Sequence, residues 1–193
     1  VYICASLLNM KNNGPKDRIL TTASRLFYEQ GYTQTGINQI LEEAKVAKAS
    51  LYQHFGSKDE LGVAYLKNER EKWFIAFQAY LNKKASASDK ILACFEFLEE
   101  SQPQRNFKGC RFINLLTELS DSSPKMREHI VEHKSKLRAL FAQLVQEHIP
   151  QAPQTMSDTI YLLYEGAIIE SKIYQHIWPI MTAKNTVKKM LEV

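Results

Sequence analysis

The most constraining feature of this chain is a pair of short helical patterns separated by only three residues. The first pattern covers residues 37–44, where apolar side chains recur at helical spacing: Ile37, Ile40, Leu41 and Ala44. The second covers residues 48–55, where Leu51 and Phe55 share one side of a helix. Residues 45–47 are too few for anything but a tight corner. Two short helices joined in this way predict a helix-turn-helix.

The outward side of the second helix carries groups that can contact DNA. Opposite its apolar pair and at the edges lie a cation, a small residue, two hydroxyls, an amide and an imidazole: Lys48, Ala49, Ser50, Tyr52, Gln53 and His54. No acidic residue stands among them, and such groups contact phosphates and base edges in a major groove. We therefore predict that helix 48–55 enters DNA. Packing of Tyr52 or His54 between helices is the alternative for those two residues.

Two further helices flank this pair. Residues 16–30 carry one apolar stripe, and Gly31 provides the left-handed stop that favours a helix C-terminus there. Ser57 and Glu60 fit a capping box, in which the Ser57 oxygen accepts from the N–H of residue 60 and Glu60 reaches back. A long helix over residues 58–80 is predicted to follow.

Residues 18–61 resemble the amino-terminal domain of the TetR family of bacterial repressors. The most specific part of the match is Leu51-Tyr-Gln-His-Phe-Gly-Ser-Lys-Asp-Glu-Leu61. The resemblance implies an all-helical homodimer that binds a palindromic operator with two such domains. It also implies release from DNA when a small molecule enters the carboxy-terminal domain.

The resemblance implies roles for individual residues as well. It assigns DNA contacts in the recognition helix to Lys48, Ser50, Tyr52, Gln53 and His54. Thr35 would cap helix 37–44 and touch a phosphate, and Lys58 would meet the DNA backbone from the start of its helix. The chain departs from the family pattern at three positions: Lys45 and Ala49, where glycine is usual, and Ala47, where a hydroxyl residue is common. A left-handed Lys45 would carry a strain of roughly 1 kcal/mol.

Composition and periodicity beyond this region predict an all-α fold of about nine helices. The 193 residues include only 7 glycines and 6 prolines, and their hydrophobic share of 45% suits a globular protein. We expect a three-helix helix-turn-helix headpiece in residues 15–60, joined through helix 58–80 to a larger ligand-binding and dimerisation domain in residues 61–193. Residues 1–14 are expected to form a disordered arm.

Two C-terminal helices are candidates for a dimer interface. Residues 156–175 are apolar almost all round, which predicts that they are covered on two sides. Residues 179–191 form the closing helix, and the resemblance implies that the two helices pair with a second copy. Complete burial of helix 156–175 inside one monomer is the alternative.

A shorter similarity concerns Cys110, which follows Lys108-Gly109 and opens a helix predicted over residues 110–119. This segment, with Lys172 later in the chain, is similar to the NemR-type subgroup of the TetR family, whose members regulate electrophile detoxification. One hypothesis is that Cys110 senses electrophiles or oxidants, with Lys172 nearby; the alternative is a buried core cysteine. Aromatic residues suggest a small apolar or electrophilic effector but also suit a plain core: Phe74, Phe95, Tyr161 and Tyr164.

Other function classes are less favoured. His129-Ile-Val-Glu132-His133 fits a zinc-peptidase pattern, yet no third ligand stands out downstream, so we expect no metal, no cofactor and no catalytic residue. The net charge of +4 permits DNA binding. Three scattered cysteines and the lack of a membrane-length apolar run favour the cytoplasm. The second interpretation is a DNA-binding activator or architectural dimer that does not respond to a ligand. The third is a helical metallohydrolase.

Overall fold

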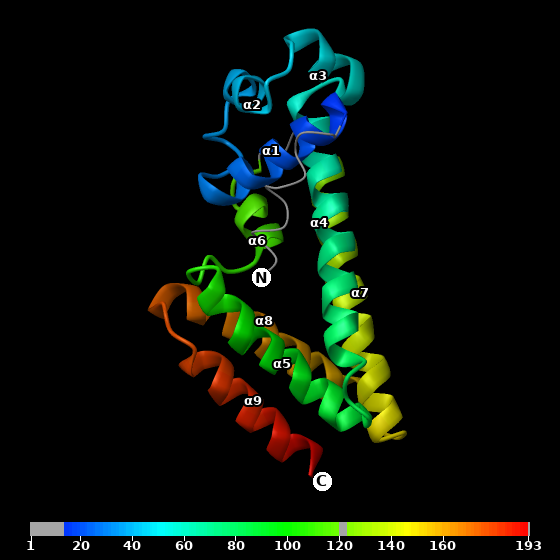
Figure 1. Cartoon of the computed structure of the whole chain (residues 1–193). Helices are drawn as coiled ribbons and strands as arrows, with labels where there is room; N and C mark the ends of the chain where they lie inside the picture. The colour runs from blue at the N-terminus through cyan, green and yellow to red at the C-terminus, as the bar shows by residue number, and fades with distance from the viewer. Residues whose placement is uncertain (1–13, 120–122, 193) are drawn as a thin grey trace. The chain divides into compact units, whose positions relative to one another are not determined.

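The computed structural model describes residues 14–119 and 123–192, and these fold into nine α-helices without a β-strand (Figure 1). The helices are α1 Pro15–Glu29, α2 Ile37–Ala44, α3 Lys48–Phe55, α4 Lys58–Leu81, α5 Ala87–Gln104, α6 Arg111–Leu116, α7 Pro124–His148, α8 Gln154–Tyr174 and α9 Trp178–Leu191. The predicted all-α class and helix number are confirmed for this part of the chain. The predicted arm lies outside the described residues except for Gly14.

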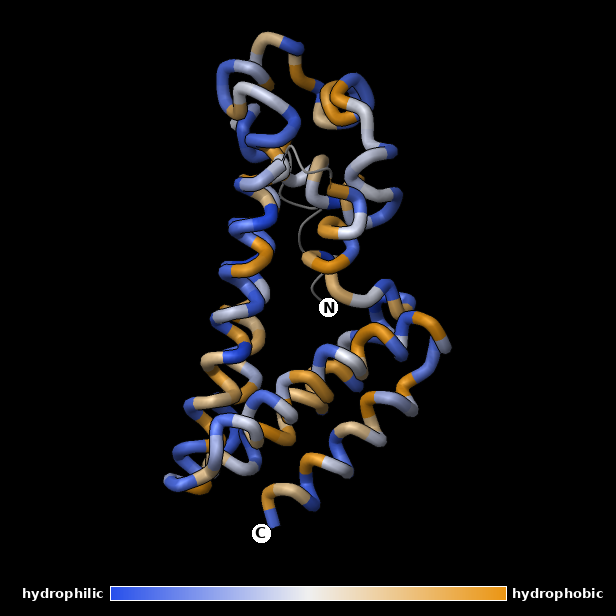
Figure 2. The backbone as a smooth tube through the Cα atoms, turned by 180° about the vertical axis from the view of Figure 1, so that it is seen from behind, coloured by the Kyte–Doolittle hydropathy of each residue, from blue (hydrophilic) through white to orange (hydrophobic). Residues whose placement is uncertain are grey.

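The chain divides into two compact units. The first comprises Val1–Glu69 with Asn114–Ile130, and the second comprises Arg70–Ile113 with Val131–Val193. Both α4 and α7 begin in the first unit and end in the second. In Figure 2, hydrophobic and hydrophilic residues alternate along the helices in short runs, which is typical of helices that bury one side.

The three headpiece helices of the first unit form where the apolar spacing predicts them. Wholly buried Ile19, Ile40 and Leu51 come one each from α1, α2 and α3, so the three helices share one core. Gly31 ends α1 with φ +97°, a left-handed conformation that glycine adopts without strain. Lys45, at the corner between α2 and α3, has φ 54° and ψ 52°. The predicted left-handed lysine is confirmed, and it costs about 1 kcal/mol.

The start of α4 confirms one half of the predicted capping box and corrects the other. The N–H of Glu60 donates to Ser57 Oγ at 3.1 Å, as expected. The Glu60 side chain does not reach back to the cap, because its Oε1 accepts from Lys125 Nζ at 2.8 Å. The salt bridge ties α4 to the first turn of α7 within the first unit.

The second unit is organised around an aromatic core. Phe77, Phe95, Phe141 and Tyr164 are buried and come from α4, α5, α7 and α8. Tyr164 lies 5.3 Å from the Phe141 ring and 5.6 Å from the Phe95 ring between centroids. Aromatic pairs at these distances add about 0.5–1.5 kcal/mol each beyond the area that they bury.

Candidate DNA-binding surface and sensor region

The recognition helix α3 buries one side and exposes the other. Leu51 is inaccessible and Phe55 is buried, whereas Tyr52 is 46% exposed. Four more predicted contact residues are exposed and Ser50 is half-buried; the exposed ones are Lys48, Ala49, Gln53 and His54. Because the apolar pair fixes the rotation of the helix, the polar side faces outward.

No side chain caps the first turn of α3. Ala47 is the N-cap residue in an extended conformation and makes no side-chain hydrogen bond to the helix. A hydroxyl residue at this position could accept from a first-turn N–H group, and alanine cannot. In this chain the helix start therefore presents its backbone donors without competition from residue 47.

Lys58, at the N-terminus of α4, is held by groups of the first unit. Its Nζ lies 4.5 Å from the centre of the Tyr32 ring, a cation–π distance. The Tyr32 hydroxyl donates to Asp59 Oδ1 at 2.7 Å, and Ser123 Oγ donates to Asp59 Oδ2 at 2.9 Å. Burial lowers the pKa of Lys58, and the charges of Asp59 and Glu118 oppose that shift. The lysine is thus partly ordered before any phosphate arrives.

Thr35 does not have its predicted role as the cap of α2. The N-cap of α2 is Gly36, and no side chain caps this helix. Thr35 is fully buried; its hydroxyl donates to the Gly31 carbonyl at 2.6 Å and accepts from Gln30 Nε2 at 3.3 Å. The predicted cap is therefore wrong, because the hydroxyl is consumed in closing the α1–α2 loop, and burial takes it away from a phosphate.

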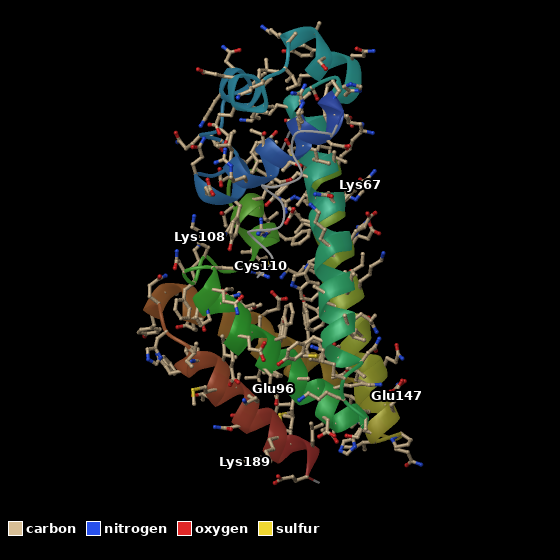
Figure 3. All side chains as sticks on the ribbon, in the orientation of Figure 1. Lys67, Glu96, Lys108, Cys110, Glu147 and Lys189 are labelled. Carbon is tan, nitrogen blue, oxygen red and sulfur yellow. The ribbon has the colours of Figure 1, made fainter. Side chains whose placement is uncertain are left out.

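Cys110 lies between α5 and α6, directly before the first residue of α6 (Figure 3). It is a free, half-buried thiol. Lys134 Nζ on α7 lies 3.5 Å from its Sγ and 2.5 Å from Glu165 Oε2 on α8. Burial alone would lower the pKa of Lys134, but the contacts with Cys110 and Glu165 raise it. A charged ammonium therefore stands beside the sulfur.

Lys172, the lysine that the sequence pairs with Cys110, packs on the neighbouring residue. A Cβ added to Gly109 would lie 3.0 Å from Lys172 Cδ, so the stem of Lys172 crosses the glycine. Lys134, which sequence reasoning missed, contacts the Cys110 sulfur through its amine. No local signal points to it, since 24 residues separate it from Cys110.

The predicted pocket aromatics all pack against other rings. Phe95 and Tyr164 pack on each other in the buried core of the second unit. Phe74 and Tyr161 are half-buried and contact His133 and Phe141, with ring centroids 5.5 Å and 6.4 Å apart. The Tyr164 hydroxyl is buried without a hydrogen-bond partner. These residues stabilise the second unit whether or not an effector binds among them.

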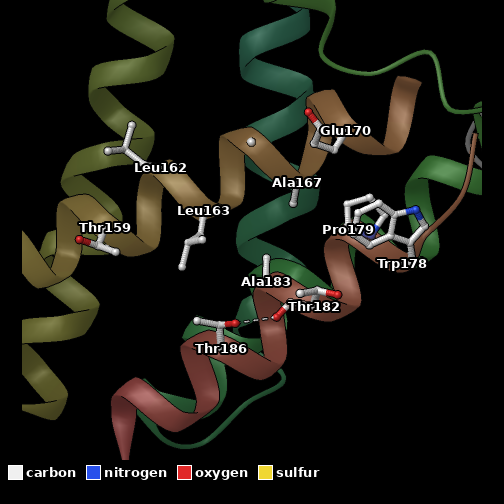
Figure 4. A pocket seen from close by; sticks show the side chains of 11 residues that line it. Thr159, Leu162, Leu163, Ala167, Glu170, Trp178, Pro179, Thr182, Ala183 and Thr186 are labelled. Carbon is white, nitrogen blue, oxygen red and sulfur yellow. Dashed lines mark hydrogen bonds between the residues drawn. The ribbon is translucent and has the colours of Figure 1, made fainter. Parts of the chain in front are cut away.

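A shallow apolar groove of about 410 Å³ runs between α8 and α9 (Figure 4). Its walls include Leu162, Leu163 and Ala167 from α8, and Trp178 and Ala183 from α9. Large apolar side chains stand exposed along the same two helices: Leu162, Ile169, Ile173, Tyr174, Trp178 and Met181. An exposed apolar strip on two adjacent helices is typical of a surface that another protein covers.

Comparisons with known proteins match both the headpiece and the longer chain. Residues 19–65 match the family model described as bacterial regulatory proteins of the tetR family. Over 91% of its length the chain is 26% identical to the HTH-type transcriptional repressor NemR of Escherichia coli, covering 93% of that protein. The crystal structure of the reduced form of E. coli NemR superposes with a TM-score of 0.78, at 26% identity over 91% of this chain and 95% of that one. Residues 19–65 thus match the TetR-family DNA-binding domain, and the chain as a whole is similar to TetR-family regulators along most of its length.

A second relative is also named as a negative regulator of transcription. The chain is 27% identical to IcaR of Staphylococcus epidermidis, a negative transcriptional regulator of the biofilm operon icaADBC, over 90% of this chain and 92% of that protein. The predicted resemblance to the TetR family and the similarity to NemR are confirmed, and the DNA-binding class follows from the headpiece match. These relatives are named as regulators and not as enzymes, in agreement with the predicted class. None of the described helices is long and apolar enough to cross a membrane.

The zinc-peptidase pattern at residues 129–133 contributes a buried histidine to the core. His133 is 3% exposed and stacks on Phe112 with centroids 3.7 Å apart and ring planes at 6°. Glu132 forms ion pairs with Arg70 and Lys136. Within residues 14–119 and 123–192, no group of three His, Cys, Asp or Glu side chains is placed to hold a metal. The pattern therefore reflects a buried histidine beside a surface ion pair.

This buried histidine predicts a loss of stability in mild acid. Burial, with smaller contributions from Lys134 and Arg70, lowers the pKa of His133 from 6.5 to about 3. Between pH 6.5 and pH 3, the His133 imidazole is protonated in the unfolded chain but not in the folded one. The free energy of unfolding is therefore unaffected above pH 6.5 and falls as the pH drops towards 3. At pH 5 the loss attributable to His133 is about 2 kcal/mol.

Urea unfolding at pH 7 and pH 5 measures this loss. His133→Phe keeps a ring against Phe112 and removes the titration, so the variant should lose about 2 kcal/mol less between the two pH values than the natural chain. Equal losses in the two proteins would show that His133 is protonated as easily in the folded state as in the unfolded one.

Proposed function

We propose that this protein is a cytoplasmic homodimeric repressor of the TetR family that binds a palindromic operator through α3. The observation that carries the DNA-binding part is the rotation of α3, which buries Leu51 and Phe55 and turns Tyr52 and Gln53 outward. An amide such as Gln53 can pair with an adenine edge, and Lys48, Ser50, His54 and Lys58 suit phosphate contacts. Ala49, with no polar side chain, lets the helix backbone approach the groove closely.

A homodimer is supported by the exposed apolar strip of α8 and α9. A second copy of the same strip would cover side chains such as Leu162 and Ile173, each 65% exposed in one chain. Two chains related by a two-fold axis would present two copies of α3, which is the symmetry that a palindromic operator matches.

Release from DNA is assigned to a small apolar or electrophilic effector or to modification of Cys110. The thiol is partly accessible, and the ammonium of Lys134 at 3.5 Å stabilises negative charge on sulfur as it attacks an electrophile. The aliphatic stem of Lys172 lies against the adjacent Gly109. The names of NemR and IcaR, a repressor and a negative regulator, support repression as the output.

Operator binding before and after treatment with N-ethylmaleimide tests this proposal. The operator is obtained by selection from random DNA duplexes, and the protein carries Cys4→Ser so that only two thiols remain. The Cys110 sulfur adds to the maleimide double bond, and the other alkene carbon takes a proton from water. We expect Cys110 to be labelled and operator affinity to fall at least about ten-fold, because a bulky adduct must displace its packed neighbours.

Three controls accompany this experiment. Cys94 is inaccessible, and burial raises its pKa, so it should stay unlabelled in the same samples. Cys110→Ser should bind the operator normally and ignore the reagent. Lys134→Gln should slow the labelling of Cys110 by about an order of magnitude. Full labelling of Cys110 with unchanged operator affinity would reject the sensor, and failure of the untreated protein to select any DNA would reject the repressor.

A further inference from the structure

A single carboxylate from the segment after α6 holds the loop between α1 and α2. Glu118 Oε2 accepts a hydrogen bond from the backbone N–H of Thr33 at 2.7 Å, across 85 positions of sequence. A Cβ added to Gly31 would lie 2.9 Å from Glu118 Oε1. Glycine is therefore favoured at position 31 for two reasons: it adopts a positive φ, and its lack of a Cβ leaves room for the carboxylate.

Glu118 is coupled to α6 through the backbone. Its N–H donates to the Leu115 carbonyl at 3.0 Å, and Thr117 Oγ1 donates to the Asn114 carbonyl at 2.8 Å. These bonds extend the last turn of α6, so the carboxylate follows any rotation or shift of this helix. The other end of α6 begins at Arg111, the residue after Cys110.

The loop that Glu118 holds determines how the helix-turn-helix begins. Thr35, at its far end, is fixed by hydrogen bonds to Gly31 and Gln30, and α2 starts two residues later at Ile37. Only residues 45–47 separate α2 from α3. A displacement of the loop therefore reaches the recognition helix through one short helix and one tight corner.

We propose that Glu118 is a positioning residue for operator recognition: its carboxylate fixes the α1–α2 loop, and α6 carries a change at Cys110 to this contact. The first half of the proposal stands on the contacts of Glu118 alone. The second half rests on the proposed sensor function of Cys110.

The direction in which DNA affinity changes when Glu118 is replaced distinguishes a positioning role from a purely electrostatic one. A carboxylate in the DNA-binding unit repels phosphates, so its removal by itself would strengthen binding to every DNA sequence. Loss of a positioning contact would instead weaken binding to the operator and leave binding to unrelated DNA equal or stronger. The ratio of the two affinities is thus the informative quantity.

The experiment measures the affinities of Glu118→Ala and Glu118→Gln for the selected operator and for a scrambled duplex. Glu128→Gln, which changes an exposed glutamate of α7 in the same unit, is the matched charge control. We expect Glu118→Ala to lower the operator-to-scrambled ratio about ten-fold, because a charge-assisted hydrogen bond is lost. Glu118→Gln keeps an acceptor for Thr33 and should lower the ratio less. An unchanged ratio in both Glu118 variants would overturn the positioning role.

Amide hydrogen exchange of Thr33 reports the contact itself. In folded protein, checked by circular dichroism, Thr33 should exchange faster in Glu118→Ala than in the natural chain and in Glu128→Gln. N-ethylmaleimide treatment of the natural chain should accelerate the same amide if α6 transmits the change. A treated protein that leaves the operator while Thr33 stays protected would overturn the α6 route and leave the sensor intact. A treated protein that stays on the operator would reject the sensor, and the affinity ratio would still decide the role of Glu118.

Discussion

Charged substitutions on the exposed strip of α8 are expected to separate the proposed dimer and nearly abolish operator binding. In Leu162→Glu/Ile173→Glu, two side chains that are each 65% exposed would carry like charges into the contact between copies. Because the residues are exposed, the monomer should keep its fold. Loss of the second headpiece removes the gain from two linked contacts, so operator affinity should fall about 100- to 10,000-fold.

Sedimentation equilibrium and fluorescence anisotropy measure the two halves of this prediction. The matched control is Ile75→Glu, which changes an isoleucine of α4 that is 72% exposed and lies outside α8 and α9. The control should remain dimeric and bind the operator normally. A double variant that stays dimeric with full operator affinity would show that α8 does not form the interface.

The second large effect is expected from the outward side of α3. Gln53→Ala and Tyr52→Ala should each lower operator affinity about ten-fold or more, since a good contact to a base edge contributes about 1–3 kcal/mol of discrimination. Affinity for scrambled DNA should hardly change, because neither residue carries charge. Lys58→Gln should weaken binding to both duplexes and reduce the salt dependence by about one phosphate contact.

Fluorescence anisotropy at several salt concentrations separates these two behaviours. Gln78→Ala, an exposed amide of α4 in the second unit, provides the control for loss of a glutamine side chain. If Gln53→Ala and Tyr52→Ala bound the operator as tightly as the natural chain, α3 would not be the reading helix.

The parts of the fold that the sequence predicts best are those that depend on neighbouring residues. Helix 48–55 and helix 37–44 have the predicted bounds, because apolar spacing decides which side of a short helix is buried. The Ser57 cap and the left-handed Lys45 follow from the needs of a helix end and a three-residue corner. Each of these features is decided within about one helical turn.

The errors and omissions concern side chains whose partners are distant in sequence. Glu60 fits a capping box by spacing, yet a lysine of α7 attracts its carboxylate. Thr35 fits a cap by type, yet the carbonyl of Gly31 takes its hydroxyl. The pairing of Cys110 with Lys134 and the stacking of His133 on Phe112 depend on how α6 and α7 pack. Periodicity predicts that these helices exist but not which side chains meet.

The most direct test of operator reading by α3 is the base preference at each position of the selected operator. Every base pair is replaced in turn, and binding is compared between the natural chain and Gln53→Ala. We expect Gln53→Ala to lose discrimination between bases at one position in each half of the palindrome, symmetrically, and to keep it at the other positions. An unchanged preference at every position would contradict the claim that α3 reads the operator.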